Sequence, residues 1–89
     1  MAAYIVTYDL MQQGQNYTCI TNKLRAYGTW CHLQGSVWII VTELNAVQVR
    51  DDLRSCLDHN DKLFVCRLAR DAAWVGHGQQ TSDWLQRNL

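Results

Sequence analysis

The chain has 89 residues, 48% of them hydrophobic, which suits one domain with a two-layer core and excludes a disordered chain. Its eight basic and eight acidic residues cancel, which argues against strong, sequence-independent capture of nucleic acid through phosphate contacts. The sequence has no apolar run long enough for a membrane span and no basic signal-peptide start within residues 1–10, so we expect a cytoplasmic protein.

Four cysteines are spread along the chain: Cys19, Cys31, Cys56 and Cys66. None forms a C-x-x-C pair, which argues against a zinc ribbon. We therefore expect four free thiols in a reducing compartment. A redox or metal sensor built on these cysteines stays open as a weaker alternative.

The first two predicted elements are a strand and a helix. Residues 3–9 are rich in β-forming residues and predict a strand that ends at Asp9. Asn16 is the expected N-cap of the helix that follows, and Gly28 stands where a C-cap glycine belongs. Between them, apolar side chains recur at helical spacing: Tyr17, Ile20, Leu24 and Tyr27.

A hairpin and a second helix come next. Residues 29–34 and 36–42 predict two strands, and Gly35 between them predicts a tight turn. Asn45 and Gln48 have the spacing of a capping box at the start of a helix. The buried face of that helix is expected to hold Ala46, Val49, Leu53, Cys56 and Leu57.

The remaining chain predicts a turn, a strand and a tail. Residues 58–61 read as a polar turn whose residues tolerate left-handed geometry, and residues 62–69 predict the fourth strand. Residues 70–89 form a C-terminal docking tail with a short helix, for which Thr81 or Ser82 is the expected N-cap. Two tryptophans in this tail, Trp74 and Trp84, suggest that it docks on another surface.

The predicted order of elements is βαββαβ, which indicates an α+β protein with the ferredoxin-like fold over residues 1–69. Its antiparallel sheet has the strand order 4-1-3-2 and carries two helices on one face. In the third strand Val37, Ile39 and Val41 point away from Trp38 and Ile40, so both faces of the sheet are apolar. The second face needs a cover, either the tail or a second subunit, and we expect a homodimer.

This topology gathers polar residues at one end of the sheet: Asp9, Gln34, Ser36, Asp58, His59, Asn60 and Asp61. Carboxylate and carbonyl oxygens suit Mg²⁺ or Mn²⁺. One Asp9 per chain is a sparse ligand set, which two copies in a dimer would double. The alternative is that the Asp9 side chain accepts hydrogen bonds from the amides of the following loop as an Asx turn, and both interpretations stay open.

Two groups of residues have a favoured structural interpretation. His32 is expected to have a structural or interface role, because the neighbouring Cys31 points to the opposite face of the strand. Four aromatic residues could stack on nucleic-acid bases, although packing is the favoured interpretation: Tyr4, Tyr8, Trp30 and Trp38.

Two stretches resemble those of a known family. "YIVTYDL", residues 4–10, is similar to the first strand of the small CRISPR-associated Cas2 proteins, and "LQGSVWII", residues 33–40, is similar to their hairpin and third strand. The match is closest to the SinR-like branch of that family, and the C-terminal tail of this chain is also similar to that branch. Toxin ribonucleases of the VapD type share the fold.

The resemblance implies a homodimer in which Asp9 of each subunit binds a divalent metal, Mg²⁺ or Mn²⁺, for phosphodiester hydrolysis. Ser36 carries over as a further motif residue of the catalytic site. We therefore expect a metal-dependent endonuclease with RNA as the preferred substrate. The alternative is a non-catalytic dimeric scaffold or adaptor that binds a protein or nucleic acid, which the neutral charge and the uncharged "MQQGQN" after Leu10 favour.

Overall fold

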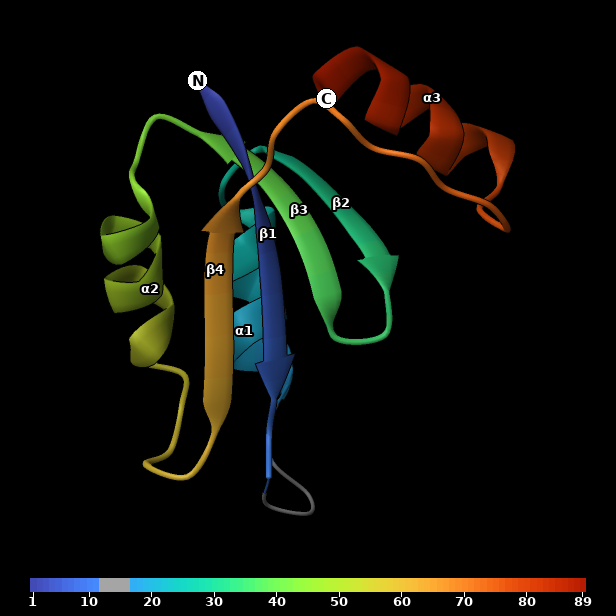
Figure 1. The fold of residues 1–89 in the computed structure, drawn as a ribbon. Helices are drawn as coiled ribbons and strands as arrows, with labels where there is room; N and C mark the ends of the chain where they lie inside the picture. Colours follow the sequence, from blue (N-terminus) through green and yellow to red (C-terminus); the bar gives the residue numbers. More distant parts are fainter. Residues whose placement is uncertain (12–16) are drawn as a thin grey trace.

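The computed structural model describes residues 1–11 and 17–89, so the expected N-cap Asn16 lies outside the described residues. The helices and strands in chain order are β1 (Ala2–Asp9), α1 (Tyr17–Arg25), β2 (Thr29–Gln34), β3 (Val37–Thr42), α2 (Ala46–Arg54), β4 (Lys62–Arg67) and α3 (Gln79–Asn88) (Figure 1). The strands form one antiparallel sheet in the order β2-β3-β1-β4, which confirms the predicted ferredoxin-like topology.

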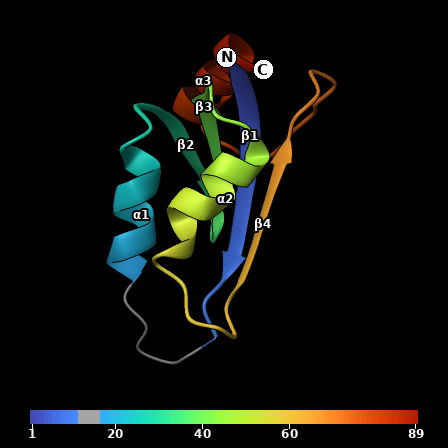
Figure 2. The same ribbon diagram turned by 90° about the vertical axis from the view of Figure 1, so that its left-hand side faces the viewer.

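Helices α1 and α2 lie side by side on one face of the sheet, which we call the helix-side face (Figure 2). Alternation along β1 and β3 directs every second side chain into this layer. The resulting core consists of nine buried residues: Tyr4, Val6, Tyr8, Ile20, Leu24, Trp38, Ile40, Val49 and Leu53. All nine lie in elements that hydrophobic periodicity predicts.

The turns and caps follow the local chemistry of the sequence with one exception. The Asn45 side chain accepts from the Gln48 amide at 2.9 Å, and the Gln48 side chain accepts from the Asn45 amide, as a capping box requires. Gly28 and Gly35 have φ of 86° and 39°, a region that favours glycine. The predicted polar turn at residues 58–61 is present, and it forms without positive φ, since no described residue other than glycine has positive φ.

The start of α3 is the exception. The helix begins at Gln79 with Gly78 as its N-cap, so neither Thr81 nor Ser82 caps it. The Ser82 hydroxyl instead accepts a hydrogen bond at 3.1 Å from the indole nitrogen of Trp74. This bond ties the irregular segment before α3 to the helix itself.

The prediction of four free thiols is wrong. Cys19 on α1 and Cys56 just after α2 form a disulfide, although 37 residues separate them in the sequence. Their Cα atoms lie 5.6 Å apart because the two helices run side by side on the same face of the sheet. Cys31 and Cys66 are free thiols, the first buried and the second exposed.

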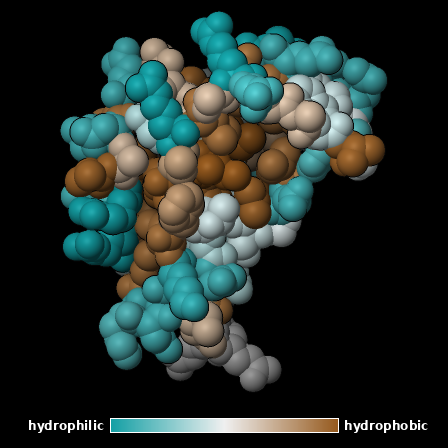
Figure 3. Space-filling view, in the orientation of Figure 1, coloured by the Kyte–Doolittle hydropathy of each residue, from teal (hydrophilic) through white to brown (hydrophobic). Residues whose placement is uncertain are grey.

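The opposite face of the sheet, which we call the outer face, has only a partial cover. Helix α3 and the segment before it pack over the β2–β3 side, where Leu85 is 2% exposed and Ile39 is 3% exposed. The β1–β4 side remains open, and Phe64 on β4 is 60% exposed. Figure 3 shows this face as a continuous apolar area with polar side chains around it. Among the described helices, none is both long and apolar enough to cross a membrane.

Candidate functional site

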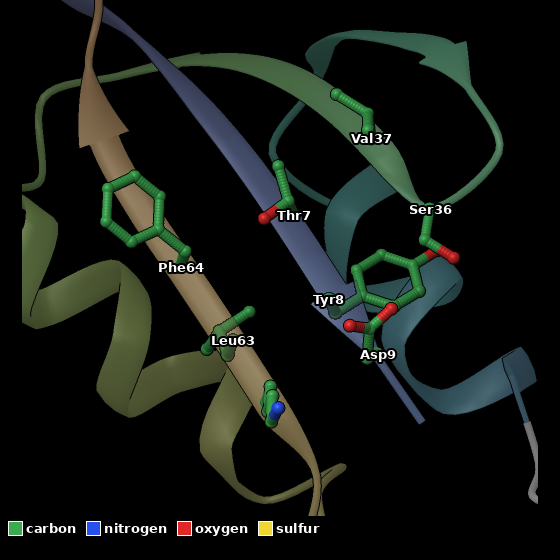
Figure 4. Close-up of a pocket in the computed structure, with 8 residues that line it drawn as sticks. Thr7, Tyr8, Asp9, Ser36, Val37, Leu63 and Phe64 are labelled. Carbon is green, nitrogen blue, oxygen red and sulfur yellow. The ribbon is translucent and has the colours of Figure 1, made fainter. Parts of the chain in front are cut away.

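A shallow hollow of about 350 Å³ lies on the outer face at the end of β1 (Figure 4). It is lined from three strands and the β2–β3 turn by Thr7, Tyr8, Asp9, Ser36, Val37, Lys62, Leu63 and Phe64. Asp9 is exposed, and both Asp9 and Ser36 line the hollow, with the Tyr8 ring drawn between them in the close-up view. The sequence-predicted pair, Asp9 and Ser36, therefore does line one site.

Backbone pairing holds the two residues in place. The amide of Tyr8 donates to the carbonyl oxygen of Ser36 at 3.2 Å, which ties the end of β1 to the β2–β3 turn. Alternation along β1 then points Thr7 and Asp9 to the outer face and Tyr8 into the helix-side core. Asp9 is thus the last residue of β1, where it is still paired with Lys62 of β4.

Tyr8 anchors this end of the strand from below. Its hydroxyl accepts a hydrogen bond at 3.2 Å from the indole nitrogen of Trp38, and both side chains are buried. Burial raises the pKa of the Tyr8 phenol, and the Trp38 hydrogen bond only partly opposes that rise. Tyr8 therefore stays neutral at ordinary pH and acts as a structural support for Asp9.

The Asp9 carboxylate has no hydrogen bond or ion pair within residues 1–11 and 17–89. The Asx-turn alternative therefore has no support in the described part of the chain. The amide of Met11, which such a turn would use, donates instead to the carboxylate of Asp61 at 2.9 Å. An exposed carboxylate without a protein partner is available to bind a cation.

The predicted polar rim separates into two parts. Asp61 has a structural role, because its carboxylate also accepts from the amide of Asp58 at 2.8 Å and so closes the turn before β4. The other rim residues do not line the hollow: Gln34, Asp58, His59 and Asn60. His32 lies on the helix-side face, where its ring stacks on Trp38.

Sequence reasoning missed Lys62, which pairs directly across from Asp9 in the β1–β4 register. Lys62 is exposed and lines the same hollow, so it places one positive charge beside the carboxylate. The strand was predicted, but the register that brings its first residue opposite Asp9 was not. Pairing the last residue of the first strand with the first residue of the fourth would have found it.

The donor set in one chain fits half of a divalent-metal site. Within the described residues there is no group of three or more His, Cys, Asp or Glu side chains that could hold a metal ion. Mg²⁺ is commonly bound by one or two carboxylates, with water and substrate phosphate completing the octahedron. The exposed Asp9 of one chain supplies one such carboxylate, and a second copy of the chain would supply the other.

A family model described as CRISPR associated protein Cas2 matches residues 1–74. The chain belongs to the Cas2 family. The match contains every strand of the sheet and both helices of the helix-side face, together with the hollow at Asp9. Membership supports a CRISPR-associated role, whereas the finer placement in the SinR-like branch stays a prediction. Helix α3 lies beyond the matched residues.

Proposed function

We propose that this Cas2-family protein is a metal-dependent endonuclease that acts as a homodimer, with RNA as its preferred substrate. The observation that carries the proposal is the Asp9 carboxylate at the end of β1, which is exposed and has no hydrogen bond or ion pair within the described residues. Ser36 and Lys62 line the same hollow and add a hydroxyl and a cation. These three groups suit an anionic phosphodiester together with a divalent cation.

Each residue has a distinct part in this mechanism. Asp9 would hold Mg²⁺ or Mn²⁺, which when bound supplies charge stabilisation at the phosphate and a more acidic water. Lys62 attracts the phosphate that is to be cut and offsets the absence of charge in "MQQGQN". The Ser36 hydroxyl can donate to a phosphate oxygen and so orient the scissile bond.

The exposed side of the outer face supports the proposed homodimer. Phe64 lines the hollow beside Asp9, and the tail leaves it 60% exposed. An exposed aromatic side chain next to an apolar sheet surface is typical of an interaction site. A second copy seated on this side would bring the two Asp9 carboxylates towards one another and would exclude water from the hollow.

Cleavage of labelled RNA in the presence of Mg²⁺ tests the proposal directly. We expect wild-type protein to cut single-stranded RNA faster than DNA, and Asp9→Asn to lower the rate by at least about a hundredfold, because removing one charge-stabilising group commonly costs that much. Asp71→Asn is the matched control, since Asp71 is an equally exposed aspartate outside the hollow. Equal cleavage by wild type and Asp9→Asn would show contamination and overturn the proposal.

The neutral net charge supports a second candidate, a non-catalytic dimeric scaffold. A scaffold would bind its nucleic acid or protein partner equally well with Asp9→Asn and would cut nothing in either form. A gel shift run beside the cleavage assay separates the two functions. Binding without cleavage, unchanged by EDTA, favours the scaffold.

A further inference from the structure

A compact aromatic cluster lies at the β2 edge of the sheet, on the helix-side face and away from Asp9. Its floor is Trp38, whose side chain is completely buried. The His32 ring stacks on Trp38 with 4.3 Å between ring centroids and 9° between planes. Trp30 lies 5.3 Å from Trp38, and the guanidinium of Arg25 lies 5.5 Å from the Trp38 ring and 5.7 Å from the Trp30 ring.

Three of these four side chains reach the surface. His32 and Arg25 are exposed and Trp30 is half-buried. The His32 ring is held in place on one face by Trp38 and at its edge by Gly35, whose carbonyl oxygen accepts from Nε2 at 2.6 Å. One face of the ring is packed on Trp38, and the residue as a whole remains exposed. A fixed ring loses little conformational entropy when another ring stacks on it.

Charge around the cluster is also favourable for an anion. Arg25 forms no salt bridge with any carboxylate in the described part of the chain. Residues 10–42, which include α1, β2 and β3, contain no Asp or Glu at all. The neutral net charge of the whole protein therefore conceals an acid-free stretch of sequence that carries Lys23 and Arg25. Lys23 is already paired with Asp52 at 3.3 Å, which leaves Arg25 as the cation free for a ligand.

We propose that Arg25, Trp30 and His32 form a binding surface for single-stranded nucleic acid. A base would stack on the His32 ring and against Trp30, while Arg25 binds the adjoining phosphate. Stacking on aromatic side chains together with a nearby cation is the usual way to hold unpaired nucleotides without reading their sequence. β2 is an edge strand with one paired neighbour, so no other strand obstructs this surface.

The position of the surface suggests how it serves the Asp9 hollow. His32 contacts Gly35, and the next residue, Ser36, lines the hollow on the other face of the sheet. A single strand that passes round the β2–β3 turn would contact both places. Binding of nucleic acid at this surface does not require Asp9. The part that the surface would play in cleavage rests on the proposed nuclease function.

Fluorescence anisotropy with labelled single-stranded RNA and DNA oligonucleotides, in EDTA, tests the surface separately from cleavage. We expect His32→Ala to weaken binding by about fivefold to a hundredfold, since stacking energies are of that size. His32→Tyr should keep most of the affinity because it retains a ring. Oligonucleotides with abasic positions should bind weakly to wild type and should not distinguish it from His32→Ala.

Arg25→Gln should lower the affinity and reduce the slope of log K against log salt by about 0.7, the value for one phosphate contact to a single strand. Arg70→Gln is the matched control, because Arg70 is an exposed arginine outside the cluster. Thermal unfolding of each variant establishes that it is folded. Wild-type affinity in folded His32→Ala and Arg25→Gln, or an equal loss in Arg70→Gln, would overturn the proposal. If His32→Ala and Arg25→Gln weaken binding as expected but no form of the protein cuts RNA, only the nuclease function is overturned.

Discussion

The two faces of the sheet differ in how completely they are covered. On the helix-side face α1 and α2 bury nine core residues and are joined by the Cys19–Cys56 disulfide. On the outer face α3 buries only the β2–β3 side and leaves the β1–β4 side, with Asp9 and Phe64, exposed. The difference indicates that the buried core of the helix-side face serves stability, whereas the open part of the outer face is available for a ligand or a second chain.

The covered part of the outer face should matter to stability nearly as much as the core. Leu85→Ala on α3 is expected to lower the free energy of unfolding by about 2–5 kcal/mol, because Leu85 is 2% exposed and its truncation leaves a cavity. Urea unfolding measures this change. Val75→Ala, at a residue 92% exposed in the same tail, should have almost no effect and serves as the control.

The Leu85→Ala variant should also make the thiol of Cys31 more accessible to solvent. Burial raises the pKa of the Cys31 thiol, so less of the reactive thiolate is present at pH 8 than at an exposed cysteine. In wild type, alkylation should therefore reach the exposed Cys66 well before Cys31. Equal alkylation rates for the two thiols in wild-type protein would contradict the packing of α3 on this side.

The helix-side face should lose stability when its disulfide is removed. Replacing both Cys19 and Cys56 by Ser is expected to cost about 2–4 kcal/mol, because the bond closes a loop between residues 37 apart in the sequence. Thermal unfolding with and without reductant measures the loss. Cys66→Ser is the control, and a reductant that leaves wild-type unfolding unchanged would argue that the bond is absent from the protein.

A substitution on the open part of the outer face should change dimer formation rather than the stability of one chain. Phe64→Ser is expected to change the stability of one chain by at most about 0.5 kcal/mol, as surface substitutions usually do. It should, however, convert the expected dimer to a monomer in light scattering at micromolar concentration. Val47→Ser, at an α2 residue 54% exposed, should leave the dimer intact. A wild-type protein of monomer mass would refute the homodimer.

Much of this contrast could be predicted from the sequence. Periodicity and caps predict each strand and helix to within a few residues, because apolar spacing and cap chemistry are local properties. The juxtaposition of Asp9 and Ser36 follows from topology alone and is confirmed, while their chemical roles stay predictions.

The features that the sequence does not predict are those set by contacts between distant residues. The Cys19–Cys56 bond depends on how closely two helices approach, and Lys62 beside Asp9 depends on strand register. The start of α3 depends on Trp74, which binds the hydroxyl that would otherwise have been a cap. Neither the disulfide nor the start of α3 leaves a spacing signal in one sequence, whereas antiparallel pairing of the predicted strand ends would have found Lys62.

We propose that Asp9 of two chains shares one divalent cation. Binding of Mn²⁺, followed by electron paramagnetic resonance, tests this proposal most directly. The account predicts one bound Mn²⁺ per two chains in wild type and in Asp71→Asn, and loss of that ion in Asp9→Asn. Binding that persists in folded Asp9→Asn, or no Mn²⁺ binding by wild type at all, would contradict it.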